Sequence, residues 1–351
     1  MTVLGIESSC DECAAAVVVD GKTILSDVVA SQIPFHTEYQ GVVPELASRM
    51  HAEWIYGVAR RALEEAGTRP QDLDGIAVTA MPGLLGSLLV GLSFAKGLAW
   101  SLGKPYIGVN HILAHLYAPR LEVASPPDYP FLGLIFSGGH SIICRVEDFD
   151  RIEVLGTTID DAAGEAFDKV SKHYGFGYPG GAAIDALAAK GDENAFAFPR
   201  PTLNKGQRRY DLSYSGLKTA AIRQLEQYRR PGAALSAENI AASFRKAAID
   251  MLADRLLRAA RDTGLRTIVA AGGVAANSYL RSLLGSQPEL DVRFPPLRLC
   301  GDNGAMVAGI GCKYLERGES SPIDLNVSAR VPLYRSPGGR EAPAPAPAQD
   351  A

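Results

Sequence analysis

The sequence predicts a two-lobed α/β fold in which one architectural unit occurs twice. A pattern of three short apolar runs joined by tight turns begins at Val3 and recurs at Phe131, and a helical pattern follows each copy. The length of 351 residues also suits two compact units, because domains average roughly 150 residues. Chance recurrence of a common hairpin is the alternative, but turn, spacing and following helix recur together.

The first copy consists of a three-stranded start, a helix and two further strands with a helix between them. Asp20-Gly21 indicates a hairpin, since this dipeptide suits a tight two-residue turn. Gly67 and Gly103 end the helical patterns before them, because glycine readily takes the left-handed conformation at a helix C-terminus. The predicted strands are 3–7, 14–19, 23–30, 75–80 and 106–109, and the predicted helices are 49–66 and 86–102.

The second copy begins after a proline-containing segment and repeats this order. Its predicted strands are 131–136, 141–146, 152–155 and 267–271, and its predicted helices are 161–174 and one over 240–256. We therefore expect an N-terminal lobe at 1–118, a linker at 119–130, a C-terminal lobe at 131–335 and a disordered tail at 336–351. The late apolar helix after Gly304 is counted with the C-terminal lobe, although it could pack back on the first lobe.

Composition excludes several classes of protein. Hydrophobic residues make up 47%, and 35 basic against 39 acidic residues give a net charge of -4, which excludes a globally basic nucleic-acid binder. Five scattered cysteines suit a reducing cytoplasm better than a disulfide framework. The most apolar run, from Leu84 to Ala95, stops at Lys96 and is too short to span a bilayer. We therefore expect a cytoplasmic protein without a signal peptide or membrane segment.

The sharpest chemical signal is the pair His111 and His115, directly after the predicted strand 106–109. On a helix, a spacing of four residues places both imidazoles on one face, where they can bind one metal ion. Ile112 stands where a zinc peptidase of this pattern needs its general-base glutamate, which argues against that class. Asp302, in the turn before the late apolar helix, is the best candidate for a third ligand. Two helix-surface histidines without a metal are the alternative, which the pair alone favours.

Three loops of small residues follow predicted strands, and together they favour a nucleotide cleft. They lie at 8–12, 137–139 and 272–277, and none matches the Walker phosphate loop or the dinucleotide fingerprint. Asp11 and Glu12 lie in the first loop, and Asp168 is placed to accept hydrogen bonds from ribose hydroxyls. Asp160 and Asp161 supply further carboxylates, and the alternative for them is that they cap the following helix.

A basic segment in this acidic chain contains Lys205, Arg208 and Arg209. Such residues can contact the phosphates of a nucleic acid. An exposed charged loop without a partner is the alternative, and it has equal weight from the sequence alone.

Taken together, these segments resemble one protein family. The matching stretches are 5–12, 111–115, 137–140, 164–169, 178–181, 272–277 and 301–304, so the resemblance covers about residues 1–320. The chain is similar to the bacterial-type tRNA N6-adenosine threonylcarbamoyltransferases (the TsaD family), formerly described as O-sialoglycoprotein endopeptidases or glycoproteases. The combination is highly specific, although no single motif is. The resemblance implies the duplicated actin/Hsp70/sugar-kinase (ASKHA) fold with a central nucleotide cleft.

The resemblance also implies a reaction and its participants. The threonylcarbamoyl group of threonylcarbamoyl-AMP would pass to the exocyclic N6 amine of the adenosine 3′ of the anticodon, in tRNAs that read codons beginning with A, with release of AMP. One divalent metal ion, Fe2+ or Zn2+, would be held by His111, His115 and Asp302. The implied partners are an inactive paralogue of the same fold (TsaB-like) and a small ATPase (TsaE-like), while a separate enzyme makes the adenylate.

Further site residues follow from the resemblance and from the chemistry. An adenine amine is a poor nucleophile and a mixed anhydride is already activated, so the enzyme must mainly position its substrates and stabilise charge. Asp11 and Glu12 are the catalytic candidates, Asp11 as the group that orients or deprotonates the amine. The implied substrate contacts are Ile135, Phe136, Ser137, Gly138, Gly139, Asp168, Gly181, Asp185 and Asn277. We expect tRNA contacts at Lys205, Arg208 and Arg209.

Three other functions fit parts of this pattern. A small-molecule kinase of the same fold would share the cleft but would not need His111 and His115. A metallopeptidase would need the glutamate that Ile112 replaces. A non-enzymatic nucleotide-dependent switch would bind partners without modifying tRNA.

Overall fold

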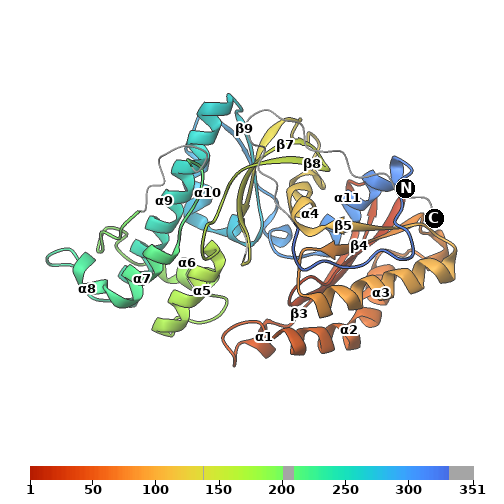
Figure 1. Cartoon of the computed structure of the whole chain (residues 1–351), viewed down its shortest axis with the longest axis horizontal. Helices are drawn as coiled ribbons and strands as arrows, with labels where there is room; N and C mark the ends of the chain where they lie inside the picture. The colour runs from red at the N-terminus through yellow and green to blue at the C-terminus, as the bar shows by residue number, and fades with distance from the viewer. Residues whose placement is uncertain (137, 201–208, 332–351) are drawn as a thin grey trace.

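The computed structural model describes residues 1–136, 138–200 and 209–331, and it contains two five-stranded sheets of the same topology (Figure 1). The first sheet has the order β3-β2-β1-β4-β5, and the second has the order β10-β9-β6-β7-β8. In each sheet an antiparallel three-stranded meander is extended by two strands parallel to its first strand. The predicted duplication is therefore confirmed. The predicted tail lies outside the described residues.

All strands except β10 form where the apolar runs predicted them. In the first sheet they are β1 (Thr2–Glu7), β2 (Glu12–Val19), β3 (Thr23–Ser31), β4 (Gly75–Met81) and β5 (Tyr106–Asn110). In the second sheet they are β6 (Phe131–Phe136), β7 (Ser141–Asp148), β8 (Arg151–Thr157), β9 (Thr267–Ala271) and β10 (Asp291–Arg293). Nearly all residues of β1, β4 and β6 are buried, as expected for central strands covered on both faces.

Helices cover both sheets. Those before residue 131 are α1 (Ile33–His36), α2 (Pro44–Glu65), α3 (Leu85–Leu102) and α4 (His111–Tyr117). Those after it are α5 (Ala163–Tyr174), α6 (Gly180–Ala188), α7 (Ser215–Arg223), α8 (Leu225–Tyr228), α9 (Ala237–Thr263), α10 (Ser278–Gly285) and α11 (Gly304–Glu316). The first sheet with α2 and α3 lies on the right of Figure 1, and α5 to α10 lie on the left.

The last helix, α11, packs on the first sheet although it is the final helix of the described chain (Figure 1). Two glycines allow this approach. A Cβ on Gly5 would lie 2.3 Å from the Gly304 carbonyl oxygen, and one on Gly304 would lie 2.5 Å from the Ala16 nitrogen. A core cluster joins α4 and α11 to β6 and β7, and its members include Leu116, Ile135 and Met306. The loop before α11 is thereby fixed beside the first half of the molecule.

One helix, α3, is long and apolar enough by length and composition to cross a membrane, with a mean hydropathy of 1.4 over 18 residues. The expectation that its apolar run is too short is wrong as a length argument, because the helix continues through Lys96 to Leu102. Core helices of globular proteins pass the same test. In the structure α3 packs on α2 and β4, and Lys96 Nζ donates to the Leu325 carbonyl oxygen at 2.6 Å.

The interpretation of Asp160 and Asp161 as caps of the following helix is wrong. Helix α5 has Ala162 at its N-cap, without a side-chain cap. Asp160 instead accepts hydrogen bonds from the Tyr214 and Ser215 amides at 2.8 and 3.2 Å, at the start of the distant helix α7. Asp161 pairs with two lysines, one of them Lys169 at 3.0 Å. Both carboxylates therefore tie the segment after β8 to other elements.

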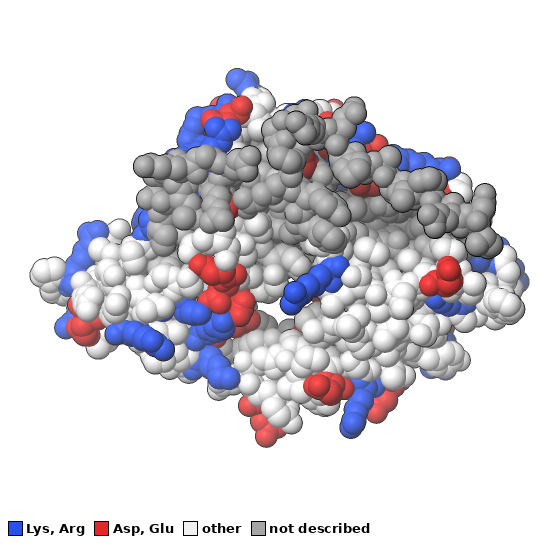
Figure 2. Space-filling model, viewed as in Figure 1, with Lys and Arg blue, Asp and Glu red and all other residues white. Residues whose placement is uncertain are grey.

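The carboxyl ends of the parallel strands meet at one edge of each sheet, which is where ligands bind in α/β folds. Gly272 makes the close approach of β9 and β6 possible: its φ is +87°, and a Cβ there would lie 2.7 Å from the Phe136 carbonyl oxygen. The face shown in Figure 2 is hollowed between the two halves, with charged side chains of both signs beside the hollow.

Candidate active site

Three potential metal ligands meet beside the end of β5. Asn110 caps α4 by accepting the Ile112 amide at 2.8 Å, so that the helix begins with His111. The imidazoles of His111 and His115 lie 4.5 Å apart between ring centroids. Asp302 Oδ1 lies 3.1 Å from His115 Nε2 and 3.6 Å from His111 Nε2. The structure therefore brings together all three predicted ligands, with their ligand atoms within 4.8 Å of one another.

The position of Asp302 depends on the start of α11. Asn303 caps this helix through its side chain, which accepts the Met306 amide at 2.9 Å. Asp27, on β3, accepts the amides of Gly304 and Ala305 at 3.1 and 3.3 Å. The side chains of Asn303 and Asp27 thus hold the N-terminus of α11. Asp302, which precedes Asn303, lies against the histidines of α4.

The electrostatics of this group reflect mutual stabilisation of charge. Burial would lower the pKa of His111, but the charges of Asp302 and Glu7 raise it to about 9. Burial would raise the pKa of Asp302, but His111 and His115 lower it to about 2. Burial, and then His111 and His115, lower the pKa of His140 to about 4. A bound metal cation would replace the imidazole protons as the positive charge beside Asp302, because a metal binds ionised carboxylate and unprotonated imidazole nitrogens.

Sequence reasoning missed Glu7, which supports this group from the end of β1. The Glu7 side chain is completely buried, and Glu7 Oε2 lies 3.0 Å from His111 Nδ1. Burial would raise the pKa of Glu7, but the charge and hydrogen bond of His111 lower it. A carboxylate at the end of an otherwise apolar strand was a usable signal, because such a group is rarely buried without a partner.

Hydrogen bonds from α2 and from the segment before α1 hold the first small-residue loop, at residues 8–12. His51, fully buried on α2, donates from Nε2 to the Cys10 carbonyl oxygen at 2.9 Å. The Gln32 amide donates to the Asp11 carbonyl oxygen at 2.9 Å. Burial, followed by the charges of Asp302 and Asp11, raises the pKa of Glu12 to about 10. Glu12 therefore lies within electrostatic reach of Asp302, a member of the metal-ligand group, and of its neighbour Asp11.

The predicted nucleoside contacts form a second group around α6 and α10. Asp168, on α5, accepts the Gly180 amide at 2.7 Å, and burial raises its pKa to about 6. Asp185 Oδ1 accepts from Asn277 Nδ2 at 3.1 Å. Gly181 has open space at its Cβ position. The charge of Asp11 contributes to the raised pKa of Asp168, so the acidic loop at Asp11 lies within electrostatic reach of Asp168.

The structure describes four of the five residues of the predicted loop at 135–139. The side chains of Ile135 and Phe136 are buried in the core, and both residues belong to β6, which pairs with β7 and β9, so neither side chain is placed to contact a ligand in the cleft. Gly138 and Gly139 are exposed, with open space at both Cβ positions. Ser137 lies outside the described residues.

The predicted tRNA contacts are largely outside the described part of the chain. Lys205 and Arg208 are not described. Arg209 is described, and its Nε lies 3.5 Å from Asp262 Oδ2 while its guanidinium lies over the Tyr210 ring.

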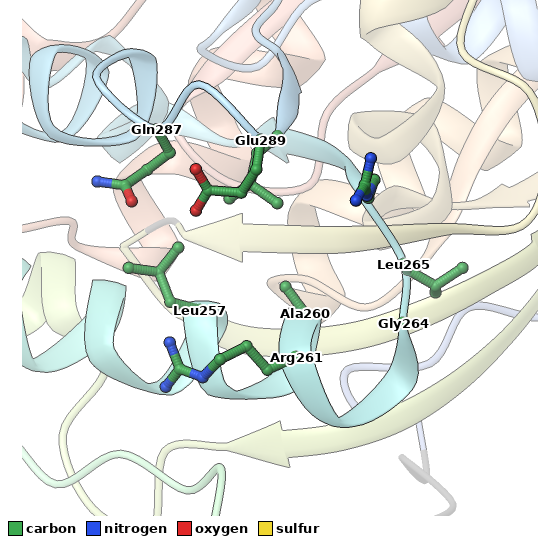
Figure 3. Close-up of a pocket in the computed structure, with 9 residues that line it drawn as sticks. Leu257, Ala260, Arg261, Gly264, Leu265, Gln287 and Glu289 are labelled. Atoms are coloured by element: carbon green, nitrogen blue, oxygen red, sulfur yellow. The ribbon is translucent and has the colours of Figure 1, made fainter.

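Two pockets lie away from the metal-ligand group. One of about 100 Å³ is lined by Thr37 and Gln40 on one side and by Asp168, Lys172 and Tyr178 on the other, so it adjoins the predicted nucleoside contacts. The other, of about 240 Å³, lies between the end of α9 and the segment after α10 (Figure 3). None of the predicted site residues lines this second pocket.

The duplicated sheets and the cleft define a protein of the actin/Hsp70/sugar-kinase class. Its fold is similar to component A of the (R)-2-hydroxyglutaryl-CoA dehydratase of Acidaminococcus fermentans, with a TM-score of 0.54 and 15% identity over 91% of this chain and 100% of that one. It is also similar to full-length HypF in its phosphate- and nucleotide-bound form, with a TM-score of 0.58 and 15% identity over 91% of this chain and 47% of that one. At this identity the likeness concerns the fold alone.

Sequence comparisons show the family. The family model of the tRNA N6-adenosine threonylcarbamoyltransferases matches residues 23–309. A relative of that name from Treponema denticola is 59% identical over 96% of this chain and 99% of its own length. Relatives of the same name from Treponema pallidum and Borreliella burgdorferi are 52% and 51% identical, each over at least 96% of both chains. The chain belongs to the tRNA N6-adenosine threonylcarbamoyltransferase family, so it is a transferase of tRNA modification rather than a kinase, peptidase or switch.

Proposed function

We propose that the chain transfers the threonylcarbamoyl group of threonylcarbamoyl-AMP to the N6 amine of the adenosine 3′ of the anticodon, in tRNAs that read codons beginning with A. The observation that carries this proposal is the meeting of His111, His115 and Asp302 in a chain of this family. In the reaction the amine nitrogen bonds to the carbamoyl carbon, the bond from that carbon to the phosphate oxygen breaks, and AMP leaves with the electron pair.

The donor set fits a divalent metal ion, and we propose Fe2+ or Zn2+. Two ligand atoms each about 2.1 Å from an ion lie about 3–3.6 Å apart in tetrahedral or octahedral geometry. The separations of 3.1 and 3.6 Å from Asp302 Oδ1 to the two histidine nitrogens agree with this range. Two imidazoles and one carboxylate leave coordination positions open, as in catalytic sites of both metals. When bound, the ion supplies a Lewis acid that can bind and polarise the threonylcarbamoyl end of the donor.

Asp11 and Glu12 would manage the proton of the amine. Asp11 accepts a hydrogen bond from the N6 amine, orients its lone pair toward the carbamoyl carbon, and takes the proton as the new bond forms. Burial raises the pKa of Glu12 to about 10, so in this proposal its carboxylic acid donates a hydrogen bond where charge develops. Asp11 is 8% exposed and Glu12 is partly buried, and this burial would limit the access of water to the reacting carbon.

The second half of the molecule would hold the nucleoside of the donor. Asp168, Gly181, Asp185 and Asn277 are the proposed contacts. The exposed glycines Gly138 and Gly139 would let main-chain amides approach the phosphate, because neither carries a Cβ. In this proposal the adenylate lies between the halves, with its acyl end directed at the metal-ligand group.

An inactive paralogue (TsaB-like) and a small ATPase (TsaE-like) are the proposed protein partners. The outer face of α3 and the adjacent helix α2 support docking of a partner, because Trp100 is 79% and Tyr56 is 66% exposed. Leu85 and Leu89, one turn apart on α3, are about half exposed. Large apolar side chains at such exposure are typical of a surface that another protein covers.

The proposed reaction can be tested with purified protein, synthetic threonylcarbamoyl-AMP and an unmodified tRNA whose anticodon reads a codon beginning with A. Mass spectrometry of the nucleosides should detect threonylcarbamoyladenosine, made with the paralogue and the ATPase present. Asp11→Asn should reduce the rate by at least about 100-fold, while the exposed control Glu64→Gln should not. Threonylcarbamoylation that survives complete metal removal would contradict the proposed metal, and ATP-dependent phosphorylation of a small molecule would favour a kinase instead.

A further inference from the structure

We propose that Glu7 is a positioning residue for the metal site: it holds the proton of His111 on Nδ1, so that Nε2 is free to bind the ion. The inference rests on the proposed metal site. It assigns a role to a carboxylate that does not itself belong to the ligand group, since its oxygens face the opposite side of the His111 ring.

The ring of His111 lies between two carboxylates. Glu7 Oε2 is 3.0 Å from Nδ1, whereas Asp302 Oδ1 is 3.6 Å from Nε2. A metal binds only a ring nitrogen without a proton, so His111 can serve through Nε2 only if its proton resides on Nδ1. Because a carboxylate can accept but not donate, the contact with Glu7 selects that tautomer and also fixes the rotation of the ring.

Glu7 is itself held in place by two other donors. Its Oε1 accepts the Ser9 amide at 2.5 Å, and its Oε2 accepts the Thr79 hydroxyl at 2.6 Å. The side chain has no exposed surface. A buried carboxylate costs several kcal/mol unless it is paired, and an apolar residue at the end of β1 would avoid that cost. The full set of donors shows that the strand end is built around this charge.

The second histidine provides an internal contrast. His115 Nδ1 is buried and has no hydrogen-bond partner among the residues that the structure describes. The Nδ1 side of His115 therefore has no counterpart of Glu7 among the described residues, and the carboxylate near this ring, Asp302, lies on its Nε2 side at 3.1 Å. Of the two rings, His111 is the one whose Nδ1 contacts a carboxylate outside the ligand group. Ser9 Oγ also lies near His111 Nδ1, but at 3.3 Å it is the more distant partner.

The contacts of Glu7 make Glu7→Gln an informative substitution. The Ser9 main-chain amide can only donate, so the glutamine carbonyl must take the place of Oε1 and its NH2 group the place of Oε2. The NH2 group then donates toward His111 Nδ1, which favours the tautomer with the proton on Nε2. Thr79 can adapt, because a hydroxyl also accepts. Glu7→Gln thus preserves volume but selects the tautomer that cannot bind the ion.

The first test measures Zn2+ affinity of the full chain by competition with a chromophoric chelator. We expect Glu7→Gln to weaken Zn2+ binding by about 10–100-fold, the range found when partners of metal-bound histidines are removed. The matched control is Glu64→Gln, an exposed glutamate on α2 that pairs with Arg60 at 3.5 Å, and it should bind Zn2+ as the wild type does. A Glu7→Gln protein with wild-type affinity overturns the inference.

The second test needs no variant at the site, so it stands even if Glu7→Gln fails to fold. The Zn2+-loaded wild-type protein, labelled with 15N at its six histidines, is examined by NMR. Two-bond couplings to the ring protons should identify a protonated Nδ1 and a metal-bound Nε2 in His111. Zinc on Nδ1 of His111 overturns the inference while leaving the metal proposal intact. A wild-type protein that binds no Zn2+ overturns both.

Discussion

Replacement of Gly272 by alanine should destabilise the edge where the second sheet meets the cleft. Gly272 has φ +87° and ψ 167°, a region that is essentially restricted to glycine. An alanine Cβ would also lie 2.7 Å from the Phe136 carbonyl oxygen and 3.0 Å from the Phe136 carbonyl carbon. These are main-chain atoms of β6, so they cannot rotate away as a side chain can.

The expected cost follows from these two effects. A non-glycine residue in this region costs about 1–3 kcal/mol, and forcing β6 and β9 apart costs about 1–3 kcal/mol more. We therefore expect Gly272→Ala to lower stability by about 2–6 kcal/mol, measured as a fall of several degrees in the thermal midpoint.

Its neighbour provides the control. A Cβ on Gly273 would meet nothing within 4 Å, and Gly273 does not have a positive φ. Gly273→Ala should therefore leave the midpoint within about 1 °C of the wild type, since substitutions without such contacts change stability by about 0.5 kcal/mol or less. Equal midpoints for the two variants would refute the argument that the β6–β9 approach requires glycine at residue 272.

Three further predictions concern binding and stability. Burial raises the pKa of Asp168 to about 6, so at pH 5 the Asp168 carboxyl is ionised in only about one molecule in eleven. Calorimetry should therefore show the affinity for adenosine rising about tenfold from pH 5 to pH 7.5. In Asp168→Asn the affinity should not change with pH over this range. The same shift means that the folded state retains a proton that the unfolded state releases, so the contribution of Asp168 to stability falls as pH rises from about 4 to 6. Asp160→Ala should destabilise the protein by about 1–2 kcal/mol in urea unfolding, because the start of α7 loses its cap; an unchanged midpoint would contradict this role. Simultaneous replacement of Lys205, Arg208 and Arg209 by alanine should weaken tRNA binding and reduce the slope of log Kd against log salt by about one per lost phosphate contact, and an unchanged slope would exclude these residues.

Much of the fold could be predicted because local signals agree with the final structure. Strands such as β6 and β9 coincide with the predicted ranges, since their apolar runs are bounded by turn residues. Gly103 and Gly175 end α3 and α5 with φ of +63° and +68°, as glycines at helix ends should. Elements with weaker patterns were not predicted. Helix α8 has four residues, and β10 has three residues at the edge of a sheet.

The site could be predicted only where residue types carry their own chemistry. The spacing of His111 and His115 indicates a shared face, whereas the sequence offers no distance between that face and Asp302. Glu7 went unnoticed because its partner, His111, is 104 positions away in the chain. The partner of Asp160 is also remote, since α7 begins 55 residues later at Ser215. Sequence patterns report neighbours along the chain, so contacts between distant segments require the fold.

The separation of the metal ligands along the chain has a structural consequence. His115 and Asp302 are 187 positions apart, and Asp302 reaches α4 only because α11 packs on β1 through Gly5 and Gly304. The ligand group can therefore form only after the first sheet and α11 are assembled, since the loop carrying Asp302 is anchored to β3 through Asp27. An ion bound by this group would bind the folded state alone, and it would stabilise that state by about 2.7 kcal/mol at a free concentration of 100 times its Kd. Because the contacts that build the site exist only in the folded state, a substitution that weakens the packing of α11 on β1 should also weaken metal binding.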